Sequence, residues 1–244
     1  MQVYMGGIAP TYSVGWKKNS SMGIFLAGCD YNCHKCHNAE IKEFKEEFLM
    51  NILDVKREIT SNINDIDSIF FTGAEPCLQR QALLSIARHA KTAGLKIGLK
   101  TNGAKPETIK SMLIHDLLDF VELNIYSDFN PGNFEKITRS QNFFNPTDAI
   151  LKNIYESLTL IKKYNPKLEI AIKTVVKKGI NDDNDILLSL ASKIQDLDAV
   201  WVLEREKEIA EDGEEIEDLQ MKEFLEEVKI LAEDKFPYLN IEII

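Results

Sequence analysis

Short apolar strands alternate with amphipathic helices along the chain, and this alternation constrains the fold more than any other feature. Apolar runs typical of buried strands occupy residues 22–28, 68–72, 96–100, 120–126, 168–176 and 200–203. Helical spacing of apolar residues covers 39–62, 78–93, 106–117, 147–164, 184–194 and 220–231, and a last extended piece covers 239–244. Near-continuous apolar strands separated by helices are typical of a parallel sheet covered by helices.

Six strand–helix units are fewer than the eight that close a full barrel. The sequence therefore predicts an α/β protein with a partial (β/α)6 TIM-like barrel. A chain of 244 residues forms such a fold as one domain, and we expect a single domain over 1–244. The polar stretch 127–146 is expected to be a loop. In this fold class, chemistry is placed at the carboxyl ends of the strands.

Charge and composition argue against nucleic-acid-binding, secreted and membrane proteins. The net charge of −10 argues against nucleic-acid binding, which needs a basic surface. No signal-peptide pattern opens the chain, and no apolar run approaches the ~20 residues that span a bilayer. We therefore expect a cytoplasmic protein without membrane contact. Residues 204–218 hold nine acids and are expected to form a solvated loop; the alternative is a docking surface for a basic partner.

Three of the four cysteines, Cys29, Cys33 and Cys36, fall within eight residues directly after the first apolar run. A tight loop with this spacing can turn three thiolates toward one metal centre. Three sulfurs do not complete a tetrahedral structural site, and on a four-iron cluster they leave one iron open. The spacing alone also allows a structural zinc site completed by His34 or His37. Cys77 stands apart and is expected to be a small buried or loop thiol rather than a metal ligand.

Two further motifs follow predicted strands. Residues 72–79 read Thr-Gly-Ala-Glu-Pro-Cys-Leu-Gln, and residues 100–107 read Lys-Thr-Asn-Gly-Ala-Lys-Pro-Glu. Because the carboxyl ends of parallel strands meet at one edge of the sheet, we expect both segments to lie beside the cysteine loop.

These motifs resemble those of a known family. The Cys-x-x-x-Cys-x-x-Cys spacing is similar to the cluster motif of the radical S-adenosylmethionine (radical SAM) superfamily. Gly28 before the first cysteine and His37-Asn38 after the last resemble the pattern of glycyl-radical activating enzymes, as do the 72–79 and 100–107 segments. The opening Gly6-Gly7-Ile8-Ala9-Pro10, with Ser13, Val14 and Trp16, resembles archaeal-type activases of anaerobic ribonucleotide reductase.

The resemblance implies a 4Fe–4S cluster held by Cys29, Cys33 and Cys36, and SAM bound at the open iron. Cleavage of SAM by one electron would give a 5′-deoxyadenosyl radical, with no catalytic side chain beyond the cluster and SAM. The expected SAM contacts are Lys35, His37, Gly73, Ala74, Glu75, Lys100, Asn102 and Asn124. The expected partners are a glycyl-radical enzyme, and a flavodoxin or ferredoxin as electron donor.

The chain departs from the family's pattern at several positions. Lys35 stands where an aromatic residue is usual, Ala74 replaces a glycine, and Lys100 replaces an aspartate. Asn124 and Tyr126 stand where activases show Asp and Lys. The Asp-x-Pro-Gly-x-Arg loop is replaced by residues 15–19, Gly-Trp-Lys-Lys-Asn.

From these departures we expect a pocket that has lost two acids, in which Lys100 pairs with the SAM carboxylate. Two alternatives to the activase stay open. One is a divergent radical SAM enzyme acting on a small metabolite or peptide. The other is a non-catalytic iron–sulfur or zinc protein.

Overall fold

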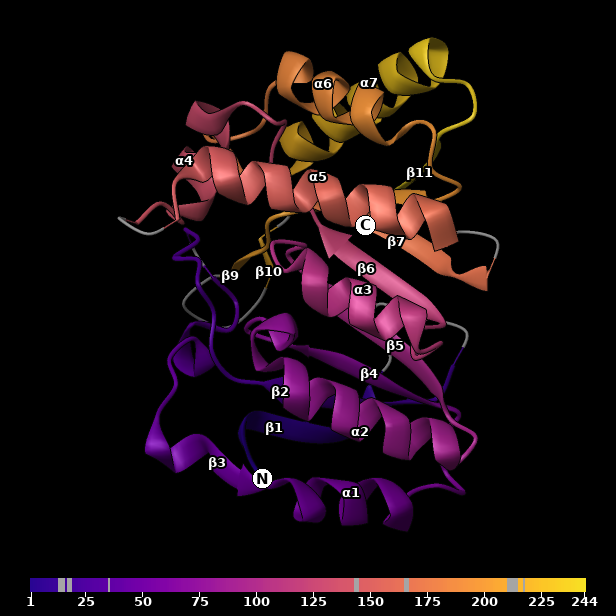
Figure 1. The fold of residues 1–244 in the computed structure, drawn as a ribbon. Helices are drawn as coiled ribbons and strands as arrows, with labels where there is room; N and C mark the ends of the chain where they lie inside the picture. The colour runs from indigo at the N-terminus through magenta and orange to yellow at the C-terminus, as the bar shows by residue number, and fades with distance from the viewer. Residues whose placement is uncertain are drawn as a thin grey trace.

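The structure, a computed structural model, describes residues 1–12, 16, 19–34, 36–142, 145–164, 167–209, 215–216 and 218–244. Within these residues a nine-stranded sheet runs through the molecule in the order β11-β8-β7-β6-β5-β4-β2-β1-β3 (Figure 1). Its strands are β1 Gln2–Tyr12, β2 Ser21–Leu26, β3 Leu49–Asn51, β4 Ser68–Gly73, β5 Lys96–Thr101, β6 Phe120–Asn124, β7 Glu169–Val176, β8 Val200–Arg205 and β11 Asn240–Ile243. The predicted α/β class is confirmed.

The six predicted strands pair in parallel from β2 to β8, and β11 adds a seventh parallel strand beside β8. β1 pairs antiparallel with β2 and β3, which extends the sheet beyond the predicted units. The two edge strands, β3 and β11, do not pair with each other. The sheet is therefore an open partial barrel, as its six strand–helix units predict.

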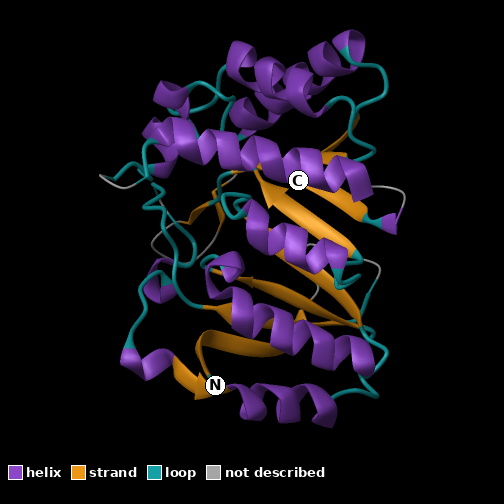
Figure 2. Cartoon of the chain, in the orientation of Figure 1, coloured by secondary structure: helices purple, strands orange, loops and turns teal. Residues whose placement is uncertain are grey.

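Helices cover one face of the sheet (Figure 2). They are α1 Ile52–Ser61, α2 Arg80–Thr92, α3 Pro106–Ile114, α4 Pro131–Thr138, α5 Thr147–Tyr164, α6 Asn184–Ile194 and α7 Leu219–Lys235. Each apolar helix face packs on the outside of the sheet, and this layer forms the main core. Gly94, with φ +83°, follows α2 in the left-handed conformation expected after a helix end.

The inner face of the sheet carries a second, smaller core. Trp16 stacks on Phe120 with ring centroids 5.3 Å apart, and Phe70 lies beside them. Gly98 makes room for these rings, because a Cβ at this position would lie 2.6 Å from the Phe70 side chain. This aromatic cluster leaves the carboxyl ends of the strands for polar residues.

Two expectations about secondary structure are wrong. The single helix expected over 39–62 is instead two 3₁₀ turns, Ala39–Ile41 and Glu46–Phe48, followed by β3 and then α1. Pairing of β3 with β1 overrides the helical spacing, and Asn51 caps α1 by accepting a hydrogen bond from the Leu53 N–H. The loop expected over 127–146 contains α4, with Asn130 as its cap.

The acidic stretch is not uniformly a solvated loop. Glu204 belongs to β8, and β9 Glu208–Ile209 pairs with β10 Glu215–Ile216. Asp218 caps α7 by accepting from the Met221 N–H. Residues 210–214 and 217 lie outside the described part of the chain. Among the described helices, none combines the length and apolar character that crossing a membrane requires.

Candidate functional site

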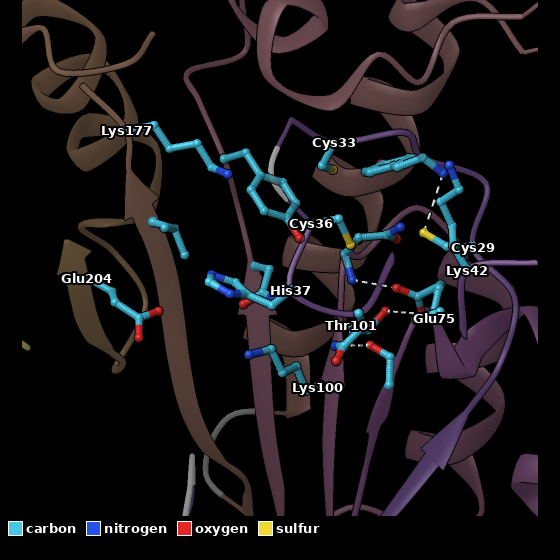
Figure 3. Close-up of a pocket in the computed structure, with 18 residues that line it drawn as sticks. Cys29, Cys33, Cys36, His37, Lys42, Glu75, Lys100, Thr101, Lys177 and Glu204 are labelled. Atoms are coloured by element: carbon cyan, nitrogen blue, oxygen red, sulfur yellow. Dashed lines mark hydrogen bonds between the residues drawn. The ribbon is translucent and has the colours of Figure 1, made fainter. Parts of the chain in front are cut away.

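A pocket lies at the carboxyl ends of the parallel strands, where the sequence places the chemistry (Figure 3). Ten of the eleven predicted site residues line it: Cys29, Cys33, Cys36, His37, Gly73, Ala74, Glu75, Lys100, Asn102 and Asn124. The eleventh, Lys35, lies outside the described residues, as do most of the residues of the 13–18 segment. The loops after β2, β4, β5, β6 and β7 thus form one site.

The cysteine loop is held by backbone hydrogen bonds to other segments. The Cys29 N–H donates to the Lys42 carbonyl at 2.8 Å, and the Asn32 N–H donates to the Thr138 carbonyl at 2.9 Å. Gly28, with φ +93°, allows the chain to turn from β2 into this loop. In the described residues no three His, Cys, Asp or Glu side chains converge on a single-ion site. The expected zinc alternative therefore has no ready-made four-ligand site here.

Burial determines the protonation of the free thiols. It raises the pKa of Cys29 well above its usual range, and it raises the pKa of Cys33 to about 12, with Cys36 adding to the rise and Lys177 opposing it. Cluster ligands are thiolates, so metal binding must displace these protons. Cys77 is buried as expected, does not line the pocket, and has a pKa well above the usual range because of burial.

Glu75 is fully enclosed and organises two strand ends. Its Oε1 accepts from the Cys77 N–H at 3.0 Å and from the Thr101 hydroxyl at 2.7 Å, and its Oε2 accepts from the Asn102 N–H at 2.7 Å. Burial raises the pKa of Glu75 against these three donors. A carboxylate oxygen has two lone pairs, so Oε2 retains one acceptor position for a ligand. Most of the carboxylate's hydrogen-bonding capacity thus binds the loops after β4 and β5 together.

Gly73 is required by a close approach of two backbones. Its φ is +115°, and a Cβ at this position would lie 2.5 Å from the Leu26 carbonyl oxygen at the end of β2. Its own carbonyl accepts from the Asn38 side-chain amide at 2.9 Å. This glycine therefore joins the 72–79 motif to the cysteine loop.

Lysines and acids form ion pairs on neighbouring strands at the pocket. Lys100 Nζ lies 3.0 Å from Glu122 Oε1, on the neighbouring strand, and Lys173 Nζ lies 2.7 Å from Glu204 Oε2. Burial would lower the pKa of Lys100, but the Glu122 carboxylate outweighs it and raises that pKa. The two motif acids at positions 100 and 124 are absent, but Glu204 lines the pocket together with Lys100, and Glu122 pairs with Lys100 beside it. Sequence positions alone did not indicate these pairs.

Two buried side-chain amide atoms in the pocket have no protein partner among the described residues. They are the Asn102 Nδ2 donor and the Asn124 Oδ1 acceptor. Buried polar groups are normally paired by protein, water or ligand. A donor and an acceptor facing one pocket suit a ligand that carries both kinds of group, such as SAM, with its ammonium, carboxylate and ribose hydroxyls. Three thiols without a converging fourth ligand suit a four-iron cluster. The residues present therefore fit both cofactors.

Tyr126 and Lys177 are among the pocket residues that the sequence analysis did not predict as ligand contacts. Tyr126 lines the same pocket as the three thiols. Burial raises the pKa of Tyr126 well above its usual range, and the three cysteines and Glu75 add to the rise. Lys177 follows β7 directly. Both stand at carboxyl ends of predicted strands, which is the same signal that identified Lys100.

Comparison with known proteins gives one family match. Residues 19–144 match the family described as a 4Fe-4S single cluster domain. A protein of Methanocaldococcus jannaschii assigned as a glycyl-radical enzyme activating enzyme is 30% identical over 221 residues, 88% of this chain and 85% of its own length.

Two other similarities are more distant. The 7-carboxy-7-deazaguanine synthase of Thermococcus kodakarensis is 29% identical over 121 residues, 42% of this chain. The crystal structure of Streptococcus suis SuiB bound to S-adenosylmethionine superposes with a TM-score of 0.61 at 14% identity over 89% of this chain. The chain spans about half the length of these two proteins, 47% and 48%. At that identity the likeness to SuiB concerns the fold.

Proposed function

The chain belongs to the radical SAM superfamily, and from this premise we propose that it cleaves SAM to generate a glycyl radical on a partner protein. It is an enzyme, and its cofactors are a 4Fe–4S cluster and SAM. One observation carries the proposal: the Cys29–Cys36 loop and the Gly73–Glu75 loop line one pocket at the carboxyl ends of the strands. A cluster motif and a SAM-binding motif act together only when they meet in this way.

The residues of this chain have separable tasks in the proposed reaction. Cys29, Cys33 and Cys36 would hold the cluster, which when bound supplies the electron for reductive cleavage of SAM to methionine and a 5′-deoxyadenosyl radical. Asn102 and Asn124 would each pair an amide group with SAM. The buried walls around Glu75 and Tyr126 exclude water, which protects a reactive radical from side reactions.

Lys100 would contact the SAM carboxylate while it keeps its ion pair with Glu122. A lysine ammonium has three donors, so the ion pair with Glu122 leaves donors for the SAM carboxylate. The Glu122 carboxylate competes for the same ammonium, which weakens that contact. If Lys100→Ala left SAM affinity unchanged in a binding titration, the contact would be absent.

A glycyl-radical partner is supported by the relative from M. jannaschii, whose similarity extends over most of both chains. It is also supported by a groove on the inner face of β6, β7, β8 and β11. Glu204 lines both this groove and the pocket, so a loop of a larger protein can approach the pocket along the sheet. A flavodoxin or ferredoxin remains the expected electron donor.

Anaerobic reconstitution with iron and sulfide, followed by dithionite and SAM, tests the chemistry. We expect 5′-deoxyadenosine from the wild type and from Cys77→Ala, and none from Cys33→Ala. This pair is matched, since both variants remove one thiol but only Cys33 lines the pocket. Absence of 5′-deoxyadenosine from the wild type would leave the non-catalytic iron–sulfur or zinc protein.

The substrate is tested separately. A glycyl-radical protein encoded beside this chain is added to the reduced enzyme with SAM, and the glycyl signal is measured by electron paramagnetic resonance. We expect that signal together with 5′-deoxyadenosine. If 5′-deoxyadenosine formed without any protein radical, the alternative enzyme acting on a small metabolite or peptide would replace the activase.

A further inference from the structure

Lys177 reaches from the end of β7 to the cysteine loop. Its Nζ donates to the His34 carbonyl at 2.5 Å and lies 2.9 Å from Glu206 Oε1. The Lys177 side chain is 5% exposed and the Glu206 side chain is 9% exposed. A charged pair held this far from water is costly unless its hydrogen bonds are satisfied. A buried Lys177–Glu206 pair beside the cysteine loop therefore suggests a functional role for the pair.

The backbone of Lys177 is also held in place by hydrogen bonds. Asn181 is fully buried, and its Oδ1 accepts from the Lys177 N–H at 2.7 Å. Its Nδ2 donates to the Tyr126 carbonyl at 2.9 Å and to the Val175 carbonyl at 3.0 Å. Gly179, with φ +73°, turns the chain between Lys177 and Asn181. The turn after β7 thus holds the root of the lysine side chain in one place.

The cysteine loop is contacted from two sides at His34. Its N–H donates to the Ile137 carbonyl at 3.1 Å, and its carbonyl accepts from Lys177. Cys33 directly precedes it, and both Cys33 and Lys177 line the pocket. Figure 3 shows Lys177 across the pocket from Glu75, on the β7 side. The lysine therefore acts on the loop both through a hydrogen bond and through its charge.

We propose that Lys177 is a positioning residue that clamps the cysteine loop to the end of β7 and places a fixed positive charge beside Cys33. This rests on the proposed cluster site. Three thiolates in a partly buried loop repel one another, and a nearby cation offsets that repulsion. The same cation favours the more negative, reduced form of a cluster. Glu206 moderates this effect because it carries the opposite charge.

The test compares Lys177→Met, Lys177→Arg and the control Lys178→Met. Lys178 is the next residue, but its side chain is 60% exposed and pairs with Asp218 on the surface. Amide hydrogen exchange is measured on the full chain before reconstitution. Iron content and the cluster's reduction potential are measured afterwards. We expect Lys177→Met to speed exchange at Asn32 and His34 at least tenfold and to retain less than half of the wild-type iron. Lys177→Arg and Lys178→Met should stay near wild type.

Reduction potentials separate the charge from a merely structural role. Lys177→Met should shift the potential downward, whereas Glu206→Gln, which removes the opposing charge, should shift it upward. If Lys177→Met fails to fold, the reduction potential of Glu206→Gln alone tests whether charge at this site acts on the cluster. Unchanged exchange and iron retention in Lys177→Met, or shifts of the same sign in both variants, would overturn the proposal. A wild type that takes up no iron would overturn the proposed function instead, while the exchange data would still decide the clamp.

Discussion

At the scale of single residues, Glu75 shows that a motif residue can hold the site together as well as contact a ligand. Glu75→Gln keeps the size of the side chain but replaces one acceptor oxygen with an NH2 donor. That donor would face either the Asn102 N–H or the Cys77 N–H, and a backbone N–H can only donate. We expect a loss of about 1–3 kcal/mol in the free energy of unfolding, measured by urea denaturation of the protein without cofactors.

Glu40→Gln is the control for this change, because Glu40 is an exposed acid that follows the cysteine loop. Its effect should stay within about 0.5 kcal/mol. Equal stability of Glu75→Gln and Glu40→Gln would show that the three hydrogen bonds to Glu75 contribute nothing measurable. In that case the carboxylate would serve the ligand alone.

The sequence identified Glu75 and its neighbours as site residues but not their mutual contacts. The motif at 72–79 predicts a ligand-facing carboxylate, and its position after a strand predicts the correct edge of the sheet. Which backbone N–H groups reach the carboxylate depends on how the loop after β5 folds back. That path is set by non-local packing, and no residue pattern encodes it.

At the scale of elements, the junction of β2 and β4 depends on Gly73. In Gly73→Ala the new Cβ would press against the Leu26 backbone, and the residue would hold a positive φ that disfavours side chains. Backbone atoms cannot move aside as a side chain can. We therefore expect a loss of at least ~2 kcal/mol in unfolding free energy, with a lower reconstituted iron content.

Ala74→Gly is the matched control, since it changes the adjacent residue in the opposite direction. Position 74 needs no positive φ, and glycine occupies it in the family pattern. We expect a change below about 1 kcal/mol. Thermal unfolding of both variants measures the difference, and a Gly73→Ala variant as stable as Ala74→Gly would contradict the close approach of β4 to β2.

The Lys100–Glu122 pair joins β5 to β6 and gives a pH dependence. The pKa of Lys100 is raised above its ordinary value of 10.5. A raised pKa means that the pair stabilises the fold fully below pH 10.5 and that this contribution is lost as the pH rises through the folded-state value. Lys100→Met should therefore be less stable than wild type by about 1–3 kcal/mol at pH 8, with the difference shrinking above pH 10.5.

Lys162→Met serves as the control for the pair. Lys162 is 54% exposed and lies 3.4 Å from Asp196, and such surface pairs contribute little. Unfolding free energies of the three proteins at both pH values measure the effect. A Lys100→Met difference that persisted unchanged above pH 11 would show that packing of the side chain, rather than its charge, is the cause.

Elements with strong periodicity were predicted well, and elements formed by distant pairing were not. The parallel strands carry their signal in continuous apolar runs. β1 and β3 were missed because both depend on antiparallel pairing, β1 with β2 and β3 with β1, where Val3 lies opposite Met50. The helix expected over 39–62 failed for the same reason, since its first part is bound to β1 and to the cysteine loop. Local spacing cannot report such competition.

At the scale of the whole molecule, the curvature of the sheet brings together charges that are distant in sequence. Lys100, Glu122, Lys173 and Glu204 come from four neighbouring strands and share the inner face. Alternation along each strand predicts that these side chains point inward. The pairing between strands, and thus the charge balance of the pocket, required the register of the sheet. The 204–218 stretch was expected to be a solvated loop for the same reason. Its first acid, Glu204, belongs to β8, and β9 and β10 pair with each other.

A pocket built from five strand ends should respond to its ligand as one unit. In the cluster-loaded protein, SAM at one hundred times its dissociation constant should raise the free energy of unfolding by about 2.7 kcal/mol. Amide exchange should slow together in the loops after β2, β4, β5, β6 and β7, because each contributes pocket residues. α7 lies outside the pocket, so its amides serve as the internal control.

Protection confined to the cysteine loop would mean that SAM meets the cluster without the Gly73–Glu75 and Asn102 contacts. Protection in all five loops requires the ligand to touch the whole edge of the sheet, which only a molecule seated between the cluster loop and β7 can do.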